Sequence, residues 1–195
     1  DRINQFDNKL YLEFGGKLFD DYHASRVLPG FEPDSKFKML YQLREQAEIV
    51  LVISAPSIER NKIRMDSGLT YDAEVLRLIE SFRKMGFLAN SVVITQYSGQ
   101  PSADQYRLRL NNLGIRSFLH YVIEGYPDNI DLIVSDEGYG RNEYVETTRP
   151  LVVITAPGPA AAKWLPVFPS CIMSIKEGFR QDMPSSKPSP SGTFL

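Results

Sequence analysis

The sequence predicts an α/β fold in which helices cover both faces of a mostly parallel sheet. Short apolar segments alternate with single amphipathic segments, and residues 48–54 form a nearly continuous apolar run. Alternating strands and helices favour parallel pairing through right-handed crossovers, and a continuous apolar strand is typical of a central position. After residue 159, proline and serine replace the periodic pattern. We therefore expect a three-layer, Rossmann-like or P-loop-like sheet that is incomplete at its C-terminus.

The first half of the chain predicts two strands and two helices. Residues 9–14 are a short apolar strand, and residues 34–47 follow as a helix with polar capping residues at its start. Residues 48–54 form the central strand. Residues 70–85 carry apolar side chains at three- and four-residue intervals, which predicts a helix that Gly86 ends.

The second half continues the same alternation. Residues 90–95 predict a strand, and residues 102–113 predict a helix. Ser102 and Gln105 have the spacing of a capping box at the start of that helix. Three more apolar segments predict strands: residues 116–123, 131–134 and 151–155.

Composition excludes several classes of protein. The chain has 195 residues, of which 43% are hydrophobic and 24% charged, as expected for one globular domain. Its net charge of −2 argues against a nucleic-acid partner, and no apolar run is long enough to predict a membrane partner or span. Cys171 is the only cysteine, so no disulfide framework is expected. We expect a cytoplasmic protein and leave self-association into a homo-oligomer open.

The loop after the first strand is rich in side chains that could act on a ligand. Lys17 and Arg26 are candidate phosphate contacts, because ligands of parallel sheets bind beyond the carboxyl ends of the strands. Asp21 and His23 are candidates for acid and base catalysis. The alternative is a solvated turn followed by a helix cap.

A second loop, residues 57–66, holds the cations Arg60, Lys62 and Arg64. Guanidinium groups give paired donors to phosphate or carboxylate, so this loop could clamp an anionic small molecule. The alternative interpretation is an exposed basic face of a helix.

A third loop places Asp136 beside Glu137, next to two glycines. Their carboxylates could hold Mg²⁺ through water, or Asp136 alone could accept a ribose hydroxyl. A plain tight turn explains the glycines equally well. His120 lies in the middle of a predicted strand, where we expect a hydrogen-bonded structural histidine rather than a catalytic one.

Several of these stretches resemble one bacterial family. Residues 10–31, 58–64, 131–140 and 146–159, the last ending in Thr-Ala-Pro-Gly-Pro, are similar to the N-terminal part of the family catalogued as domain of unknown function 1846. The resemblance implies a cytoplasmic bacterial protein considerably longer than this chain, with a P-loop-like α/β domain followed by further domains. It implies no established activity.

The resemblance ends after Pro159. It implies a continuation Gly-Ser-Gly-Lys-Met-Ala-Thr-Cys, of which only Lys163 is matched here. Deleting one base from a coding sequence for that continuation, with synonymous codons chosen freely, yields residues 160–173 as they stand. We therefore expect an α/β domain over residues 1–159 and a disordered or out-of-frame tail over residues 160–195, which the underlying nucleotide sequence would test.

Two functions remain open. In the first, intact relatives are enzymes that use a nucleotide, with Mg²⁺, or a phosphometabolite, and this chain is an inactive fragment. Glycines and cations from three loops would line the anion site: Gly15, Gly16, Lys17, Arg60, Arg64, Gly158 and Lys163. In the second, the domain is a non-catalytic module that binds a small ligand or mediates assembly.

Overall fold

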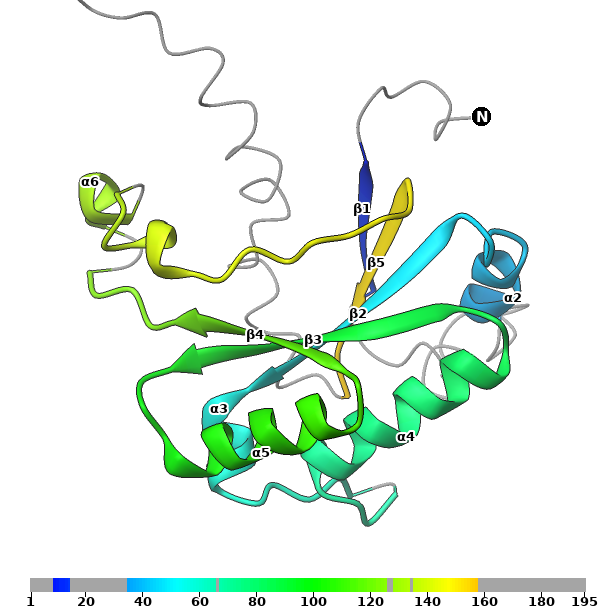
Figure 1. Cartoon of the computed structure of the whole chain (residues 1–195), viewed down its shortest axis with the longest axis horizontal. Coiled ribbons are helices and arrows are strands. Elements are labelled where there is room, and N and C mark those ends of the chain that lie inside the picture. Colours follow the sequence, from blue (N-terminus) through cyan, green and yellow to red (C-terminus); the bar gives the residue numbers. More distant parts are fainter. Residues whose placement is uncertain (1–8, 15–34, 66, 126–127, 134, 158–195) are drawn as a thin grey trace, which may run out of the picture.

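The computed structural model describes residues 9–14, 35–65, 67–125, 128–133 and 135–157 (Figure 1). Within these residues five parallel strands form one sheet in the spatial order β1-β5-β2-β3-β4. The strands are β1 (Leu10–Phe14), β2 (Ala47–Ser54), β3 (Leu88–Tyr97), β4 (Arg116–Tyr121) and β5 (Leu151–Thr155). The predicted α/β class with a parallel sheet is confirmed.

Strand β2 lies at the centre of this sheet. All of its residues are buried, and it pairs with β5 on one side and β3 on the other. Its side chains alternate between the two faces, so that Leu51 and Ile53 join a larger core while Val50 and Val52 join a smaller one. This double coverage explains why the strand reads as a continuous apolar run.

Helices pack against one face of the sheet and enclose the larger core. They are α2 (Ser35–Tyr41), α3 (Ala55–Glu59), α4 (Tyr71–Lys84) and α5 (Pro101–Asn112). In α4 the buried side chains of Val75, Ile79 and Phe82 form the inward stripe. The Tyr106 hydroxyl of α5 donates to the Asp72 carbonyl of α4 at 3.0 Å, and Figure 1 shows these two helices side by side.

The connection from β4 to β5 passes over the opposite face. It contains α6 (Ile130–Ile133) and the short 3-10 helix η2 (Tyr139–Arg141), and its last part runs across the strands to β5 (Figure 1). Val145 of this connection is fully buried in the same cluster as Val50 and Val93. Strands β2, β3 and β4 follow one another in one direction along the sheet, and the step from β4 to β5 runs in the opposite direction. Because crossovers are right-handed, the connections of the first kind lie on one face of the sheet and the connection to β5 lies on the other.

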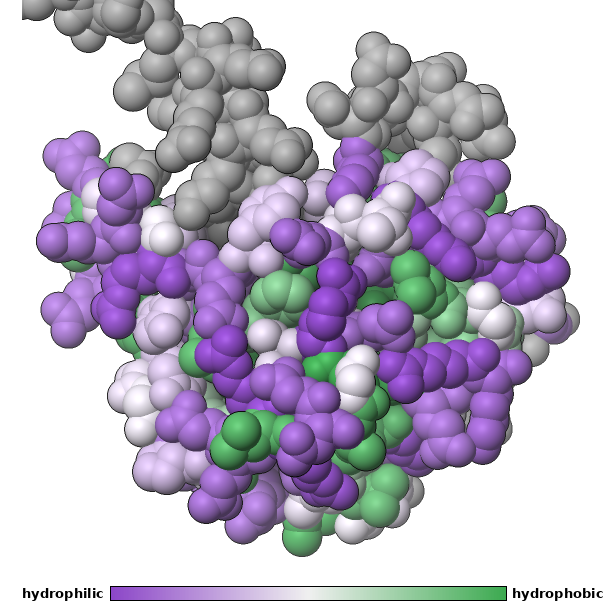
Figure 2. Space-filling view, viewed as in Figure 1, coloured by the Kyte–Doolittle hydropathy of each residue, from purple (hydrophilic) through white to green (hydrophobic). Residues whose placement is uncertain are grey.

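Polar side chains predominate on the face of the molecule shown in Figure 2, and its apolar side chains form small separate areas. The large apolar side chains of the described residues are instead concentrated in the two cores on either side of the sheet.

The prediction of a strand over residues 131–134 is wrong, because residues 131–133 belong to α6; residue 134 lies outside the described residues. The side-chain oxygen of Asn129 accepts the Leu132 amide at 3.2 Å, and the Asn129 carbonyl accepts the Ile133 amide at 3.0 Å. An asparagine cap therefore starts a helical turn here. A run of three apolar residues does not by itself distinguish a strand from a buried helical turn.

Two predicted helix ends also differ. The helix predicted to reach residue 47 ends at Tyr41, because residues 42–46 form tight turns that lead into β2. The capping box predicted from Ser102 and Gln105 is wrong, because α5 already begins at Pro101. Ser102 thus lies inside the first turn, and its buried hydroxyl has no hydrogen-bond partner among the described residues. Proline at the first helical position fixes the start instead.

A buried carboxylate joins three segments at the amino end of β2. Glu48 is fully buried, and its side chain accepts the Thr148 amide at 2.7 Å and pairs with Arg116 at 3.3 Å. Buried carboxylates are stable only when paired in this way. Because Glu48 lies at the amino edge of the sheet, its role is to hold the β4 to β5 connection against β2.

Candidate functional site

The carboxyl ends of the five strands lie along one edge of the sheet, where open parallel sheets bind their ligands. Phe14 pairs with Thr155 at one end of this edge, and Tyr97 pairs with Tyr121 at the other. Many candidate residues follow β1 and β5 and lie outside the described residues: Gly15, Gly16, Lys17, Asp21, His23, Arg26, Gly158 and Lys163. Their proposed roles stay predictions.

The structure places Arg64 at the carboxyl end of β5. Its guanidinium pairs with the Glu74 carboxylate of α4 at 2.9 Å and also donates to the Pro157 carbonyl. The side chains of Arg64 and Glu74 are only 11% and 1% exposed. Arg77 donates to the same carboxylate at 2.7 and 2.8 Å. Arg64 therefore ties the last described residue of the chain, directly before Gly158, to the buried end of α4.

The other two cations of this loop have different surroundings. Arg60 is exposed at the end of α3, and Lys62 is exposed with its ammonium 5.4 Å from the centre of the Tyr71 ring. A short antiparallel bridge between Ile63 and Thr70 folds the segment back on itself. Cations that are neighbours in the sequence are thus divided between one buried ion pair and two exposed side chains.

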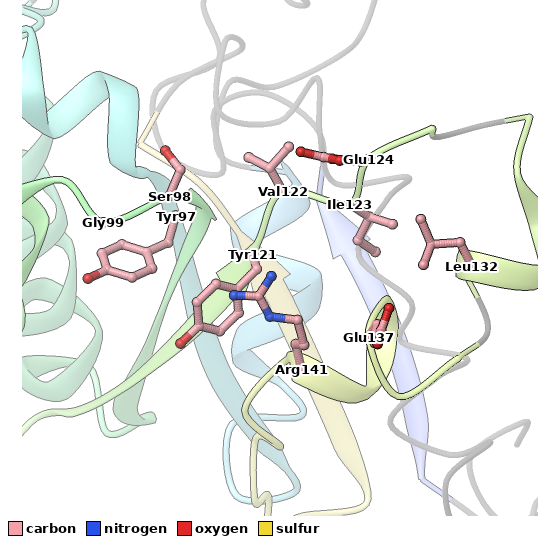
Figure 3. Close-up of a pocket in the computed structure, with 10 residues that line it drawn as sticks. All are labelled: Tyr97, Ser98, Gly99, Tyr121, Val122, Ile123, Glu124, Leu132, Glu137 and Arg141. Carbon is pink, nitrogen blue, oxygen red and sulfur yellow. The ribbon is translucent and has the colours of Figure 1, made fainter.

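A pocket of about 950 Å³ opens at the ends of β3 and β4 (Figure 3). Its lining residues are Tyr97, Ser98, Gly99, Tyr121, Val122, Ile123, Glu124, Leu132, Glu137 and Arg141. The rings of Tyr97 and Tyr121 meet edge to face, with centroids 5.5 Å apart. Arg141 reaches over the Tyr121 ring, and its guanidinium carbon lies 4.5 Å from the ring centre (Figure 3). The pocket thus has an aromatic wall carrying a cation.

A distortion in β3 sets the position of Tyr97. Ile94 pairs with Leu119 and Tyr97 with Tyr121, so β3 uses one residue more than β4 between these two pairs. Gln96 lies within this bulge and has a φ of 54°, in the left-handed region that glycine normally occupies. Such a conformation costs about 1–3 kcal/mol and is concentrated at functional sites. A bulge also redirects the side chains that follow it.

The segment that carries Arg141 is fastened to the free edge of β4 by side chains. The Asn142 side chain accepts the Tyr121 amide and the Glu143 carboxylate accepts the Leu119 amide, both at 2.9 Å. Arg107 of α5 donates to the same Glu143 carboxylate at 2.8 Å. These bonds satisfy amides that an edge strand would otherwise leave open. They also hold η2 against the pocket.

Of the two predicted carboxylates, the structure brings Glu137 to the pocket. Asp136 and Glu137 are both exposed, and only Glu137 is among the lining residues. A Cβ built at Gly138 would lie 2.1 Å from the Leu132 carbonyl oxygen, so the turn requires glycine there. Within the described residues, no group of three His, Cys, Asp or Glu side chains could hold a metal ion. Binding of Mg²⁺ by these carboxylates stays a prediction.

His120 is the hydrogen-bonded, buried residue that the sequence predicted. Its Nε2 lies 3.2 Å from the Glu143 carbonyl oxygen. Burial lowers the pKa of His120 from 6.5 to about 4, and the hydrogen bond to Glu143 opposes only part of that change. A ring held neutral and buried at neutral pH supports structure, and it is not among the residues that line the pocket.

Sequence reasoning missed the aromatic wall. Tyr97 lies in a strand-end segment of unspecific composition, and neither Tyr121 nor Arg141 stands in a recognisable motif. The available signal is a tyrosine near the end of each of two consecutive predicted strands: Tyr97 follows the strand predicted over residues 90–95, and Tyr121 lies near the end of the one predicted over residues 116–123. Pairing Tyr97 with Tyr121 also requires the bulge at Gln96, which no spacing rule predicts.

Comparison with known proteins places the chain in a family. The profile of the family described as Domain of unknown function DUF1846, N-terminal, matches residues 1–184. Similar relatives include UPF0371 proteins from Streptococcus pneumoniae strains CGSP14 and JJA, each 58% identical over 163 residues. The match covers 84% of this chain and 33% of each relative, so the chain spans about a third of the length of the curated relatives it matches.

None of the helices that the structure describes has the length and apolar character needed to cross a bilayer. The names of the relatives state no activity. Because the family profile covers most of the chain and the identity to these relatives is high, the protein belongs to the DUF1846 family, a family of unknown function, as the resemblance predicted.

Proposed function

We propose that this domain binds a nucleotide or a phosphorylated metabolite along the carboxyl edge of its sheet. The observation that carries the proposal is the pocket at the ends of β3 and β4, on the edge that also includes the end of β5. A pocket of this size at the carboxyl edge of a parallel sheet is the usual place for a small-molecule ligand. The proposal includes that the sheet binds its ligand as Rossmann-like or P-loop-like sheets do.

The phosphate end of the ligand would lie at β5. Ala156 and Pro157 lead directly from this strand into Gly158, as in the first part of a phosphate-binding loop, and Arg64 holds the Pro157 carbonyl in place. A phosphate cradle needs converging backbone amides with glycine conformations. The alanines at residues 160–162 add side chains at this point. Intact relatives would then carry the activity, and this chain would be an inactive fragment with weakened phosphate binding.

Two further features belong to the proposal. Mg²⁺ would accompany the phosphates of a nucleotide, since hard cations prefer the oxygens of phosphates and carboxylates. A cytoplasmic location is also part of this proposal and fits a nucleotide ligand.

Isothermal titration calorimetry tests the proposal on this chain and on a full-length, in-frame relative. ATP, GTP and inorganic pyrophosphate are titrated with and without Mg²⁺. Arg60→Ala should weaken binding, because Arg60 is exposed at the end of α3, directly beyond the carboxyl end of β2. Lys84→Ala is the matched control, because Lys84 ends α4 near the amino edge of the sheet. Absence of heat with every one of these compounds in the relative would contradict the proposal.

A second function, assembly, is supported by a different observation. In the segment folded by the bridge from Ile63 to Thr70, Ile63 is 60% exposed, Leu69 is 36% exposed and Met65 is fully exposed. Exposed apolar side chains close together are typical of contact surfaces. Light scattering should then show an oligomer that Ile63→Lys with Met65→Lys dissociates. A monomeric mass at high concentration would exclude self-assembly through this surface.

A further inference from the structure

We infer that the pocket at the ends of β3 and β4 binds the nucleoside part of the ligand, with its base stacked on the Tyr121 and Arg141 pair and its ribose hydroxyls at Glu137. The inference rests on the proposed function for the identity of the ligand. It adds which end of the ligand lies where, and which side chains recognise it.

The wall of the pocket suits a flat, unsaturated ring. Tyr121 is stacked with the guanidinium of Arg141 at 4.5 Å and is braced from the side by Tyr97 at 5.5 Å. The Tyr97 hydroxyl is itself fixed by Asp104 of α5 at 2.7 Å, which limits the freedom of this ring. Nucleobases stack on tyrosine rings and on arginine guanidinium planes alike. A base can therefore extend the existing stack without rearranging it.

The charge of the pocket indicates which part of a nucleotide enters. Among the described residues, the charged side chains that line it are one cation, Arg141, and two carboxylates, Glu124 and Glu137, so that 1 − 2 gives a net charge of −1. This balance repels a phosphate group and favours a neutral one. Carboxylate oxygens accept hydrogen bonds from the vicinal hydroxyls of a ribose, which is how dinucleotide-binding sheets commonly hold that sugar.

The local backbone maintains this geometry at some cost. The left-handed Gln96 and its bulge turn Tyr97 onto Tyr121, and side-chain bonds from Asn142 and Glu143 hold the Arg141 segment against β4. A strained residue and a bulge beside a pocket are typical of a site where side-chain direction matters.

The strand register sets the distance between the two regions. Thr155 at the end of β5 is level with Val92 of β3, five residues before Tyr97, and β4 lies three strand spacings from β5. The end of β5 is therefore roughly 20 Å from Tyr121. A base in the pocket leaves the phosphates directed along the edge toward β5, and a ligand that contacts both regions must span this distance.

The test measures the four common ribonucleosides, which lack phosphate, against this 195-residue chain by ligand-observed NMR saturation transfer and calorimetry. Tyr121→Leu and Arg141→Gln should each weaken nucleoside binding by about tenfold, since one lost stacking contact is worth about that factor. Glu137→Gln should reduce the preference for a nucleoside over its 2′,3′-dideoxy analogue. Arg109→Gln, an exposed arginine of α5 outside the pocket, is the control. Circular dichroism melting curves establish that each variant is folded.

The outcomes separate this inference from the proposed function. Nucleoside binding that depends on Tyr121 and Arg141 supports the inference, even where pyrophosphate does not bind. Nucleotide and pyrophosphate binding of equal strength, unaffected by the folded Arg141→Gln variant, overturns the inference and leaves the proposed function standing. Absence of binding by nucleosides, nucleotides and pyrophosphate overturns both.

Discussion

Replacing Glu74 with glutamine should destabilise the fold strongly, because this substitution removes the carboxylate that neutralises a buried guanidinium. Glu74 is 1% exposed and Arg64 is 11% exposed, and their closest atoms are 2.9 Å apart. Breaking one partner of a buried ion pair costs about 3–5 kcal/mol. In the variant, Arg77 is solvated by water, because its side chain is 51% exposed. The side-chain oxygen of the new glutamine still accepts a hydrogen bond. We therefore expect a loss of about 2 kcal/mol, below the usual range.

Urea denaturation followed by circular dichroism measures this loss. With a slope of about 2 kcal/mol per molar urea, the midpoint should fall by about 1 M. Glu80→Gln is the control, because Glu80 lies on the same helix and pairs with Lys84 at 2.7 Å but is 66% exposed. The control midpoint should not move measurably, since exposed pairs are screened by solvent. Equal shifts for the two variants would refute the reasoning from burial.

Three other measurements follow from single residues. The unfolded chain protonates His120 near pH 6.5, and the folded chain does so only near pH 4. The free energy of unfolding should therefore fall by about 3 kcal/mol as the pH drops from 6.5 to 4. His120→Gln should flatten the dependence of the urea midpoint on pH. Gly138→Ala should lower the free energy of unfolding by on the order of 2 kcal/mol, since the added Cβ would lie 2.1 Å from a carbonyl oxygen. A Cβ at Gly68 meets no atom within 4 Å, so Gly68→Ala should cost less in the same assay. Gln96→Gly should raise the thermal midpoint of unfolding, because the left-handed φ of 54° at this position is free of strain only in glycine. A lower midpoint would show that the Gln96 side chain contributes more to stability than the backbone strain costs.

Elements buried on one side or on both sides of the sheet could be predicted from the sequence. β5 has the bounds that its apolar run predicted, and β2 and α4 differ from prediction by only one residue at their ends. In these segments the pattern of burial repeats with the period of the element itself, so local sequence contains the information. The same argument explains the failure over residues 131–134, where three apolar residues after an aspartate are too few to show a period.

The candidate site could be predicted only in part. Its location at the carboxyl edge follows from the parallel topology. Glu137 was a candidate because a strand was predicted directly before its loop, where the structure has α6, and it nevertheless lines the pocket. The pairing of Tyr97 with Tyr121 depends on a backbone distortion, and the position of Arg141 depends on side chains that bind the edge of β4. Both are contacts between residues distant in sequence, and neither leaves a short motif.

Arg64 shows why a cluster of cations in the sequence is weak support for an anion site. The sequence places three cations close together: Arg60, Lys62 and Arg64. In the segment folded by the bridge from Ile63 to Thr70, however, Arg64 is buried and is already neutralised by Glu74. A guanidinium held this way stabilises the loop at β5 and has little remaining capacity for a phosphate. In the proposed anion site, the remaining contacts are therefore the exposed Arg60, the cations after β1 and the backbone amides after Gly158.

The described residues support one direction for the proposed nucleotide. Among them, a phosphate in the pocket at β3 and β4 would lie beside Glu124 and Glu137 with only Arg141 to oppose them, and the Arg141 guanidinium already faces the Tyr121 ring. A base at the end of β5 would meet, among the same residues, the Arg64 and Glu74 ion pair, which offers no ring to stack on. Reversing the ligand thus loses the stacking energy and adds charge repulsion at the same time. Only the orientation with the base at Tyr121 avoids both costs.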